Sequence, residues 1–85
     1  MMYDVEFVNS ASKEFRSLEY QIKHRVADAI DRLKVNPRPR GVIKLHGQEN
    51  LYRISVGIYR VVYEINDRLN LIRITRIRHR REAYR

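Results

Sequence analysis

The sequence has 85 residues and a formal net charge of +8, with 44% hydrophobic and 33% charged residues, a composition typical of a folded protein. So short a chain predicts one domain, 1–85, because neither half could bury enough surface to fold alone. The absence of cysteine excludes disulfides and thiolate zinc sites, and no apolar run approaches the roughly 20 residues of a membrane span.

The N-terminal part of the chain predicts a strand followed by helix. Residues 3–7 alternate between apolar and acidic side chains, the pattern of a half-buried strand. Asn9 and Ser10 then offer an N-cap for a helix. An apolar stripe with spacings of mostly three and four follows, comprising Ala11, Phe15, Leu18, Ile22, Val26, Ala29, Ile30 and Leu33. One long helix or two helices fit this stripe, and we favour two, with a break near Ser17 to Tyr20.

Three strands are predicted after a proline-rich connector. The helix ends before residues 36–41, NPRPRG, because proline cannot continue an α-helix. Runs of β-branched and aromatic residues then span Leu51 to Val56, Ile58 to Asn66 and Asn70 to Ile77, with short turns between them. The predicted fold class is α+β, with an N-terminal strand, the helices and a three-stranded antiparallel meander. The helices should pack on one face of a mostly antiparallel sheet.

The other face of that sheet must be solvated or bind a partner. Strand alternation places on it Arg53, Ser55, Arg60, Glu64, Arg73 and Thr75. Residues 44–85 carry ten Lys/Arg and four Asp/Glu, a balance of +6, whereas residues 1–43 carry eight and six, a balance of +2. A polyanion is attracted to such a field because neutralised phosphates release counterions. RNA, DNA, an acidic membrane surface and an acidic protein all fit this charge.

Three motifs follow one another in the second half of the chain. They are K-L-x-G at residues 44–47, Y-R-I-x-x-G-x-Y-R-V-V-Y at 52–63, and H-R-x-x-A-Y at 79–84. In their order and spacing the sequence resembles the RelE/ParE toxin superfamily, specifically its RelE-type mRNA interferases, over the whole chain. The resemblance implies a RelE-like fold and the toxin of a type II toxin–antitoxin module. Such toxins cleave mRNA in the ribosomal A site without a metal or other cofactor and so inhibit translation.

The resemblance also implies a reaction and roles for single residues. The ribose 2′-OH attacks the adjacent phosphorus and leaves a 2′,3′-cyclic phosphate and a 5′-hydroxyl. Arg60 matches the arginine that stabilises the phosphate, and Arg78 matches a second one at the leaving group, where the very high pKa of a guanidinium makes it a reluctant acid. Tyr84 matches a tyrosine that stacks on a base, worth about 1–3 kcal/mol. Arg53 and Ser55 occupy positions where some relatives have lysines. We keep Arg53 among the predicted catalytic residues. Neither residue can act as a general base at neutral pH.

The identity of the general base stays open. His79 is our candidate, because an unperturbed imidazole has a pKa of about 6.5 and related toxins use a histidine near the terminal tyrosine as acid or base. Lys44 and His46 are alternatives. The three histidines lack metal-ligand spacing, so no metal site is predicted. The predicted RNA-binding residues are Lys44, Arg73, Arg76, Arg80, Arg81 and Arg85.

The resemblance implies three partners: a cognate antitoxin, the ribosome and its mRNA. The toxin–antitoxin complex should be oligomeric and bind operator DNA through the antitoxin, with no role for a membrane. Many relatives continue into a further helix, and this sequence ends at Arg85, so we expect an open apolar groove where an acidic amphipathic antitoxin segment docks. The N-terminal segment lacks the apolar core of a signal peptide, so we expect a cytoplasmic protein.

Two other functions remain open. A ParE-like inhibitor of DNA gyrase shares the fold without nuclease activity, and a non-catalytic RNA-binding module would use the same arginines. The terminal R-H-R-R-x-x-Y set favours RNA cleavage, because a gyrase-binding protein has no chemical need for it. Basic residues on predicted strands argue against a helix-turn-helix repressor.

Overall fold

The computed structural model describes residues 2–47 and 49–83 and confirms the predicted α+β fold. Its elements are β1 (Asp4–Phe7), α1 (Asn9–Arg16), α2 (Tyr20–Val35), β2 (Ile43–Lys44), β3 (Leu51–Val56), β4 (Tyr59–Asn66), β5 (Leu71–His79) and α3 (Arg80–Ala83). The strands form one sheet in the order β1-β5-β4-β3-β2. Only β1 and β5 run parallel among these described pairs, so the sheet is mostly antiparallel, as predicted.

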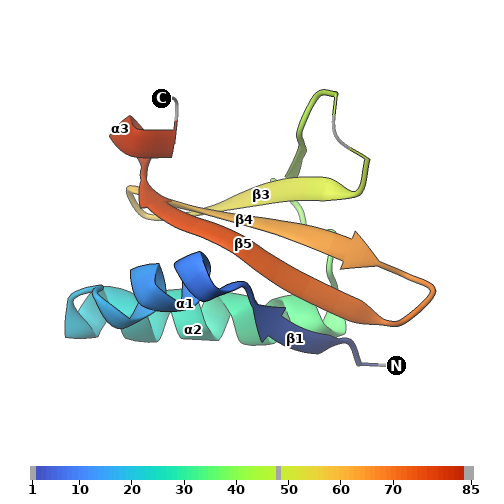
Figure 1. Cartoon of the computed structure of the whole chain (residues 1–85), viewed down its shortest axis with the longest axis horizontal. Helices are drawn as coiled ribbons and strands as arrows, with labels where there is room; N and C mark the ends of the chain where they lie inside the picture. The colour runs from blue at the N-terminus through green and yellow to red at the C-terminus, as the bar shows by residue number, and fades with distance from the viewer. Residues whose placement is uncertain (1, 48, 84–85) are drawn as a thin grey trace.

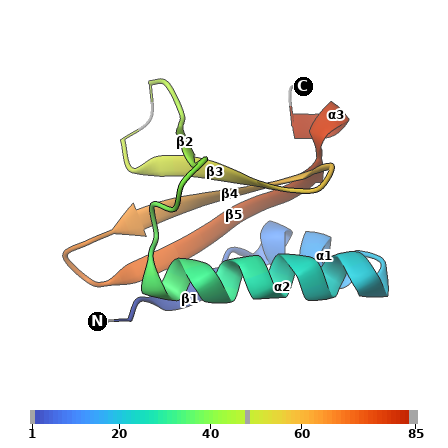
Figure 2. The ribbon, with the colours of Figure 1, turned by 180° about the vertical axis from the view of Figure 1, so that it is seen from behind.

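Both long helices lie on the same face of the sheet (Figure 1), and α2 runs along it from end to end when seen from behind (Figure 2). The core between these layers is made of Ala11, Val26, Ile30, Leu33, Tyr52, Val56, Val61, Tyr63, Ile65, Ile72, Ile74 and Ile77. Each fully buried aliphatic side chain contributes about 1.5–3 kcal/mol to folding. No helix in the described residues is long and apolar enough to cross a membrane.

The helical region consists of two helices, as favoured, but its start differs from the prediction. The predicted N-cap at Asn9 and Ser10 is wrong, because both residues are already helical and Val8 occupies the N-cap position without a side-chain cap. The N–H of Val8 donates to the carbonyl oxygen of Ile74, so the extended chain of β1 continues up to the helix. At the break, the hydroxyl of Ser17 lies 3.1 Å from a carbonyl oxygen of the last helical turn.

A bulge in β5 sets which side chains face away from the helices. The pairing of β4 with β5 shifts between Val62 and Tyr63, so that Val62 faces Arg76 and Tyr63 faces Ile74, with Thr75 as the extra residue. If the same residues alternated strictly, with no bulge, Arg76 and Arg78 would share the inward direction of Ile74. The bulge therefore turns both arginines onto the uncovered face of the sheet.

Polar contacts fix the connector between α2 and β2. Arg38 Nη2 lies 2.8 Å from Asp67 Oδ2, and the Tyr3 hydroxyl donates to Asp67 Oδ1 at 2.6 Å. The buried hydroxyl of Tyr63 donates to the carbonyl oxygen of Pro37 at 2.7 Å, and burial raises the pKa of Tyr63. These contacts tie the proline-rich segment to the β4–β5 hairpin.

The short strand β2 was not predicted. Its two residues are too few for a periodic pattern, and both are exposed. Ile43 pairs with Arg53 and Lys44 with Tyr52, which places the K-L-x-G loop at the outer edge of the sheet.

Candidate functional site

The uncovered face of the sheet presents three rows of side chains that cross neighbouring strands. The row nearest α3 contains Ser55, Arg60 and Arg78. The middle row contains Arg53, Val62 and Arg76. The third row contains Leu51, Glu64, Arg73 and Glu6. The first two rows carry positive charge alone, and we call them the arginine rows.

Arg60 and Arg78 form the centre of the first arginine row. They occupy directly opposed positions on β4 and β5, where Cβ atoms lie about 4.5–5.5 Å apart. Arg60 Nη1 donates to the hydroxyl oxygen of Ser55 at 2.8 Å, which fixes its side chain across β3. Two adjacent guanidiniums suit a phosphate group, because each presents planar N–H donors that match phosphate oxygens.

Glu14 on α1 contacts the β5 end of this row. Its Oε2 accepts a hydrogen bond from Arg78 Nε at 2.8 Å, and its Oε1 accepts one from the backbone N–H of Ile77, also at 2.8 Å. Glu14 was not predicted from the sequence, because a single glutamate on the polar side of a helix carries no motif.

His79 lies at the junction of β5 and α3. Its Nδ1 accepts a hydrogen bond from the backbone N–H of Arg81 at 3.2 Å, and its ring stands edge-on to Tyr59 with centroids 5.6 Å apart. The N–H of Arg80 donates to the carbonyl oxygen of Ile58 at 2.7 Å, so α3 is anchored to the β3–β4 turn. An Nδ1 that accepts a hydrogen bond places the proton of a neutral imidazole on Nε2.

The remaining predicted site residues fall into separate places. Lys44 and His46 line a hollow of about 350 Å³ with Leu45, Gly47 and Glu49. Lys44 pairs with Tyr52 on β3. Tyr52 lies three residues from Ser55, which is roughly 10 Å along the strand at 3.4 Å per residue, so Lys44 is far from the first arginine row. Arg80 and Arg81 are exposed on α3, whereas Tyr84 and Arg85 lie outside the described residues.

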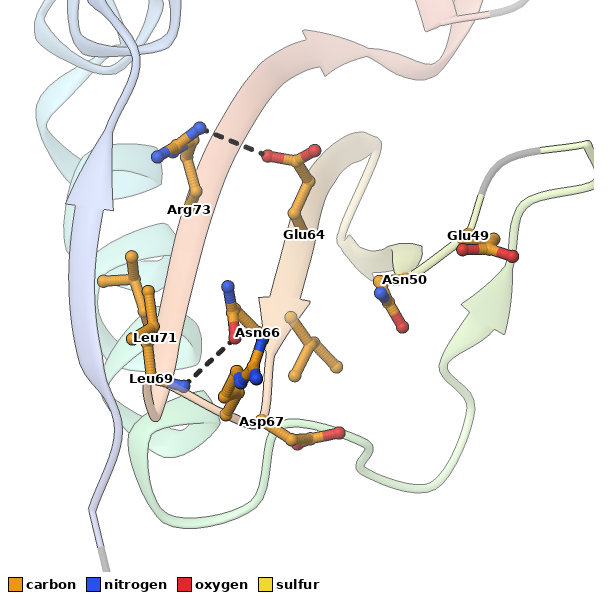
Figure 3. A pocket seen from close by; sticks show the side chains of 10 residues that line it. Glu49, Asn50, Glu64, Asn66, Asp67, Leu69, Leu71 and Arg73 are labelled. Atoms are coloured by element: carbon orange, nitrogen blue, oxygen red, sulfur yellow. Dashed lines mark hydrogen bonds and ion pairs between the residues drawn. The ribbon is translucent and has the colours of Figure 1, made fainter.

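Arg73 differs from the other predicted RNA-binding arginines. Its Nε lies 2.9 Å from Glu6 Oε1 and its Nη1 lies 3.8 Å from Glu64 Oε1. The second ion pair is visible in Figure 3, at the rim of a pocket of about 550 Å³. Carboxylates of Glu49, Glu64 and Asp67 line this pocket together with two arginines, so its charge is nearly balanced. Its walls are therefore poorly suited to phosphate.

An apolar groove lies between β1, α1 and α2. It has a volume of about 290 Å³ and is lined by Val5, Phe7, Ser12, Phe15, Ala27, Ile30, Asp31 and Lys34. Docking of an antitoxin segment in an apolar groove stays a prediction. Within residues 2–47 and 49–83, no three His, Asp or Glu side chains are placed to hold a metal ion.

Comparison with known proteins assigns the family. The ParE toxins of type II toxin–antitoxin systems, parDE, match residues 5–84. A protein named "Putative toxin RelE1" from Methanocaldococcus jannaschii is 30% identical over 90 residues, which cover 100% of this chain and 98% of that protein.

Two crystal structures contain similar chains. In the archaeal RelE–RelB complex from Pyrococcus horikoshii, one chain superposes with a TM-score of 0.83 at 34% identity and covers 94% of this chain and 97% of its own length. In the intact E. coli RelBE toxin–antitoxin complex, the TM-score is 0.80 at 25% identity, with 88% and 93% covered. The chain therefore belongs to the ParE toxin family of type II toxin–antitoxin systems, within the RelE/ParE superfamily, and is a toxin of the RelE type.

Proposed function

We propose that this toxin is a ribosome-dependent endoribonuclease that cleaves mRNA in the A site. The observation that carries the proposal is the direct opposition of Arg60 and Arg78 on the uncovered face of the sheet. A β-bulge is needed to place Arg78 there, and like charges so placed weaken the strand pair. Such an arrangement is expected where a polyanion binds.

In the proposed reaction, negative charge develops on the phosphate oxygens, which Arg60 and Arg78 would contact. The 2′-oxygen forms a bond to phosphorus, and the bond from phosphorus to the 5′-oxygen breaks, leaving a 2′,3′-cyclic phosphate. A base takes the 2′-OH proton, and the 5′-oxygen gains a proton as it leaves. The dianionic phosphorane between these steps would be stabilised by Arg60, held by Ser55, and by Arg78 near the leaving oxygen. No metal or cofactor has a step in this proposal.

His79 remains our candidate for the proton transfer, although acting as a base would require it to change tautomer. To accept a proton at Nε2, the ring must carry its own proton on Nδ1 and lose the hydrogen bond from Arg81. One such hydrogen bond contributes about 0.5–1.5 kcal/mol. General base catalysis contributes 10²- to 10⁴-fold, or about 3–5 kcal/mol, so the change of tautomer is affordable.

The partners in this proposal are the translating ribosome, its mRNA and a cognate antitoxin. The matched chains from Pyrococcus horikoshii and E. coli were solved in toxin–antitoxin complexes, which supports an antitoxin for this chain. An acidic segment laid over the arginine rows would neutralise them and exclude RNA. The complex would be oligomeric and bind operator DNA through the antitoxin, and the toxin would act in the cytoplasm, where ribosomes translate.

The test is primer extension on an mRNA in a purified translation system. We expect discrete cuts in ribosome-bound message that persist in EDTA-treated toxin and fall to a slow residual rate with Arg60→Ala and with Arg78→Ala. Arg32→Ala is the matched control, because it removes one positive charge from an exposed position on α2 and should leave the cuts unchanged. An intact message in cells whose growth still stops would contradict the proposal. Inhibition of gyrase supercoiling would then support the ParE-like alternative.

A further inference from the structure

We propose that Glu14 is a positioning residue that orients Arg78 for the reaction, an inference that rests on the proposed function. One carboxylate on α1 joins two adjacent groups of β5, the backbone N–H of Ile77 and the Nε of Arg78, each at 2.8 Å. The contact spans 64 positions of sequence and links the helical layer to the arginine rows.

The first contact of Glu14 satisfies a backbone N–H at the edge of the sheet. β1 covers β5 only as far as Ile74, which pairs with Phe7 and accepts the N–H of Val8. Beyond this point α1 replaces β1 beside β5. The N–H of Ile77 would then lack a strand partner on that side, and Glu14 Oε1 accepts it.

The second contact offsets repulsion at the catalytic pair. Arg78 stands opposite Arg60, and a carboxylate beside Arg78 lowers the electrostatic cost of that arrangement. The side chains of Glu14 and Arg78 are 22% and 37% exposed, so their ion pair is partly shielded from salt. A guanidinium can bind a carboxylate through Nε and a phosphate through other donors, because its N–H groups point in different directions.

A second pair on the same strand provides a matched comparison. Arg73 Nε lies 2.9 Å from Glu6 Oε1, with the same pair of atom types as in the Arg78 contact, but its side chains are 48% and 49% exposed. Glu6 serves no backbone N–H of β5 among the described hydrogen bonds. Glu6→Gln therefore removes an equivalent negative charge from beside Arg73, an arginine outside the arginine rows.

The substitution Glu14→Gln separates the two contacts of Glu14. Glutamine keeps one acceptor oxygen for the N–H of Ile77 and places an NH₂ donor where Arg78 needs an acceptor. The sheet edge should stay intact while Arg78 loses its orientation. Thermal unfolding and protection of the Ile77 amide from hydrogen exchange report on the edge, independently of activity.

The first measurement is NMR of the Arg78 side chain in the full-length free protein. We expect an Arg78 Nε–H signal that is protected from solvent exchange in wild type and in Glu6→Gln, and loses protection in Glu14→Gln while the Ile77 amide keeps it. An Arg78 signal unchanged by Glu14→Gln would overturn the proposal. This measurement needs no cleavage, so it stands even if the proposed function fails.

The second measurement is a double-mutant cycle on cleavage of ribosome-bound message in single turnover. Glu14→Gln should lower the maximal rate by about tenfold or more with little change in the concentration for half-maximal rate, because misplacing a catalytic group acts mainly on the chemical step. In an Arg78→Ala background the same substitution should have no further effect. Glu6→Gln should keep the wild-type maximal rate. Equal losses from Glu14→Gln in both backgrounds would show that Glu14 does not act through Arg78.

Discussion

Arg60 on β4 and Arg78 on β5 lie directly opposite each other on the uncovered face of the sheet. Like charges at opposed positions destabilise an antiparallel pair. The hydroxyl of Ser55 and the carboxylate of Glu14 each accept a hydrogen bond from one of the two guanidiniums, at 2.8 Å. The fold therefore holds in place two cations whose repulsion an RNA phosphate between them would relieve.

Arg76 and Arg73 should differ in their contribution to RNA binding. Arg76 lies in the middle arginine row, whereas Arg73 is paired with Glu6 and Glu64. For Arg76→Ala, the slope of log Kd against log salt for a non-cleavable single-stranded RNA should fall by about 0.7, the value of one phosphate contact. For Arg73→Ala the slope should stay near the wild-type value. Equal reductions in the two slopes would contradict the division of the face into arginine rows and a charge-balanced row.

Deletion of Thr75 should remove the bulge without destroying the fold. In the shortened strand, strict alternation points Ile74 and Ile77 inward and Arg76 and Arg78 outward, as the bulge does in the full chain. We expect cooperative thermal unfolding to persist, measured by circular dichroism.

A deletion elsewhere in the same hairpin controls for the shortening of the chain. Leu69 is 63% exposed in the β4–β5 turn, so removing it should leave the bulge and the cooperative transition in place. Loss of the cooperative transition on deletion of Thr75 alone would contradict the assignment of Thr75 as the extra residue of the bulge.

The strands and helices were predictable because they depend on local patterns. The meander follows from β-branched runs, and the helices from an apolar stripe with a break at Ser17. The helix start was misjudged, since Val8 is fixed by a hydrogen bond to Ile74, far away in sequence. The two-residue strand β2 exists because β3 lies beside it, and two residues carry no period.

The candidate site was predictable in its residue types but not in its geometry. Motifs placed Arg60 and Arg78 in it, yet strict alternation from Ile74 would have turned Arg78 toward the helices. One extra residue in a strand reverses the face on which every later side chain would lie under strict alternation. Sequence patterns of this length do not locate such a residue. Glu14 was missed for a related reason, because its partners lie 63 and 64 positions away.

Asp67→Asn should weaken the fold at neutral pH and much less in acid. Hydrogen bonds from Arg38, then from Tyr3, hold the pKa of Asp67 below its usual range. A carboxyl with a lowered folded-state pKa stabilises the fold above its unfolded pKa of about 3.9, and this contribution is lost as the pH falls through the folded pKa. Urea denaturation at pH 7 and near pH 2.5 measures both effects. Asp28→Asn, at an exposed position on α2, is the control.

His79→Gln tests the proton transfer without removing the contact at the start of α3. The side-chain oxygen of glutamine can accept the N–H of Arg81 as Nδ1 does, so thermal stability should stay near wild type. Glutamine cannot carry a proton between substrate and water, so the rate of cleavage in ribosome-bound message should fall by about 10²- to 10⁴-fold.

Matched substitutions distinguish His79 from Lys44 and His46 as the group that transfers the proton. If His79 is that group, Lys44→Gln and His46→Gln should keep a maximal rate near wild type, since Lys44 is paired with Tyr52 rather than with the arginine rows. A rate that falls by about 10²-fold or more in Lys44→Gln or His46→Gln, but not in His79→Gln, would assign the proton transfer to the affected residue.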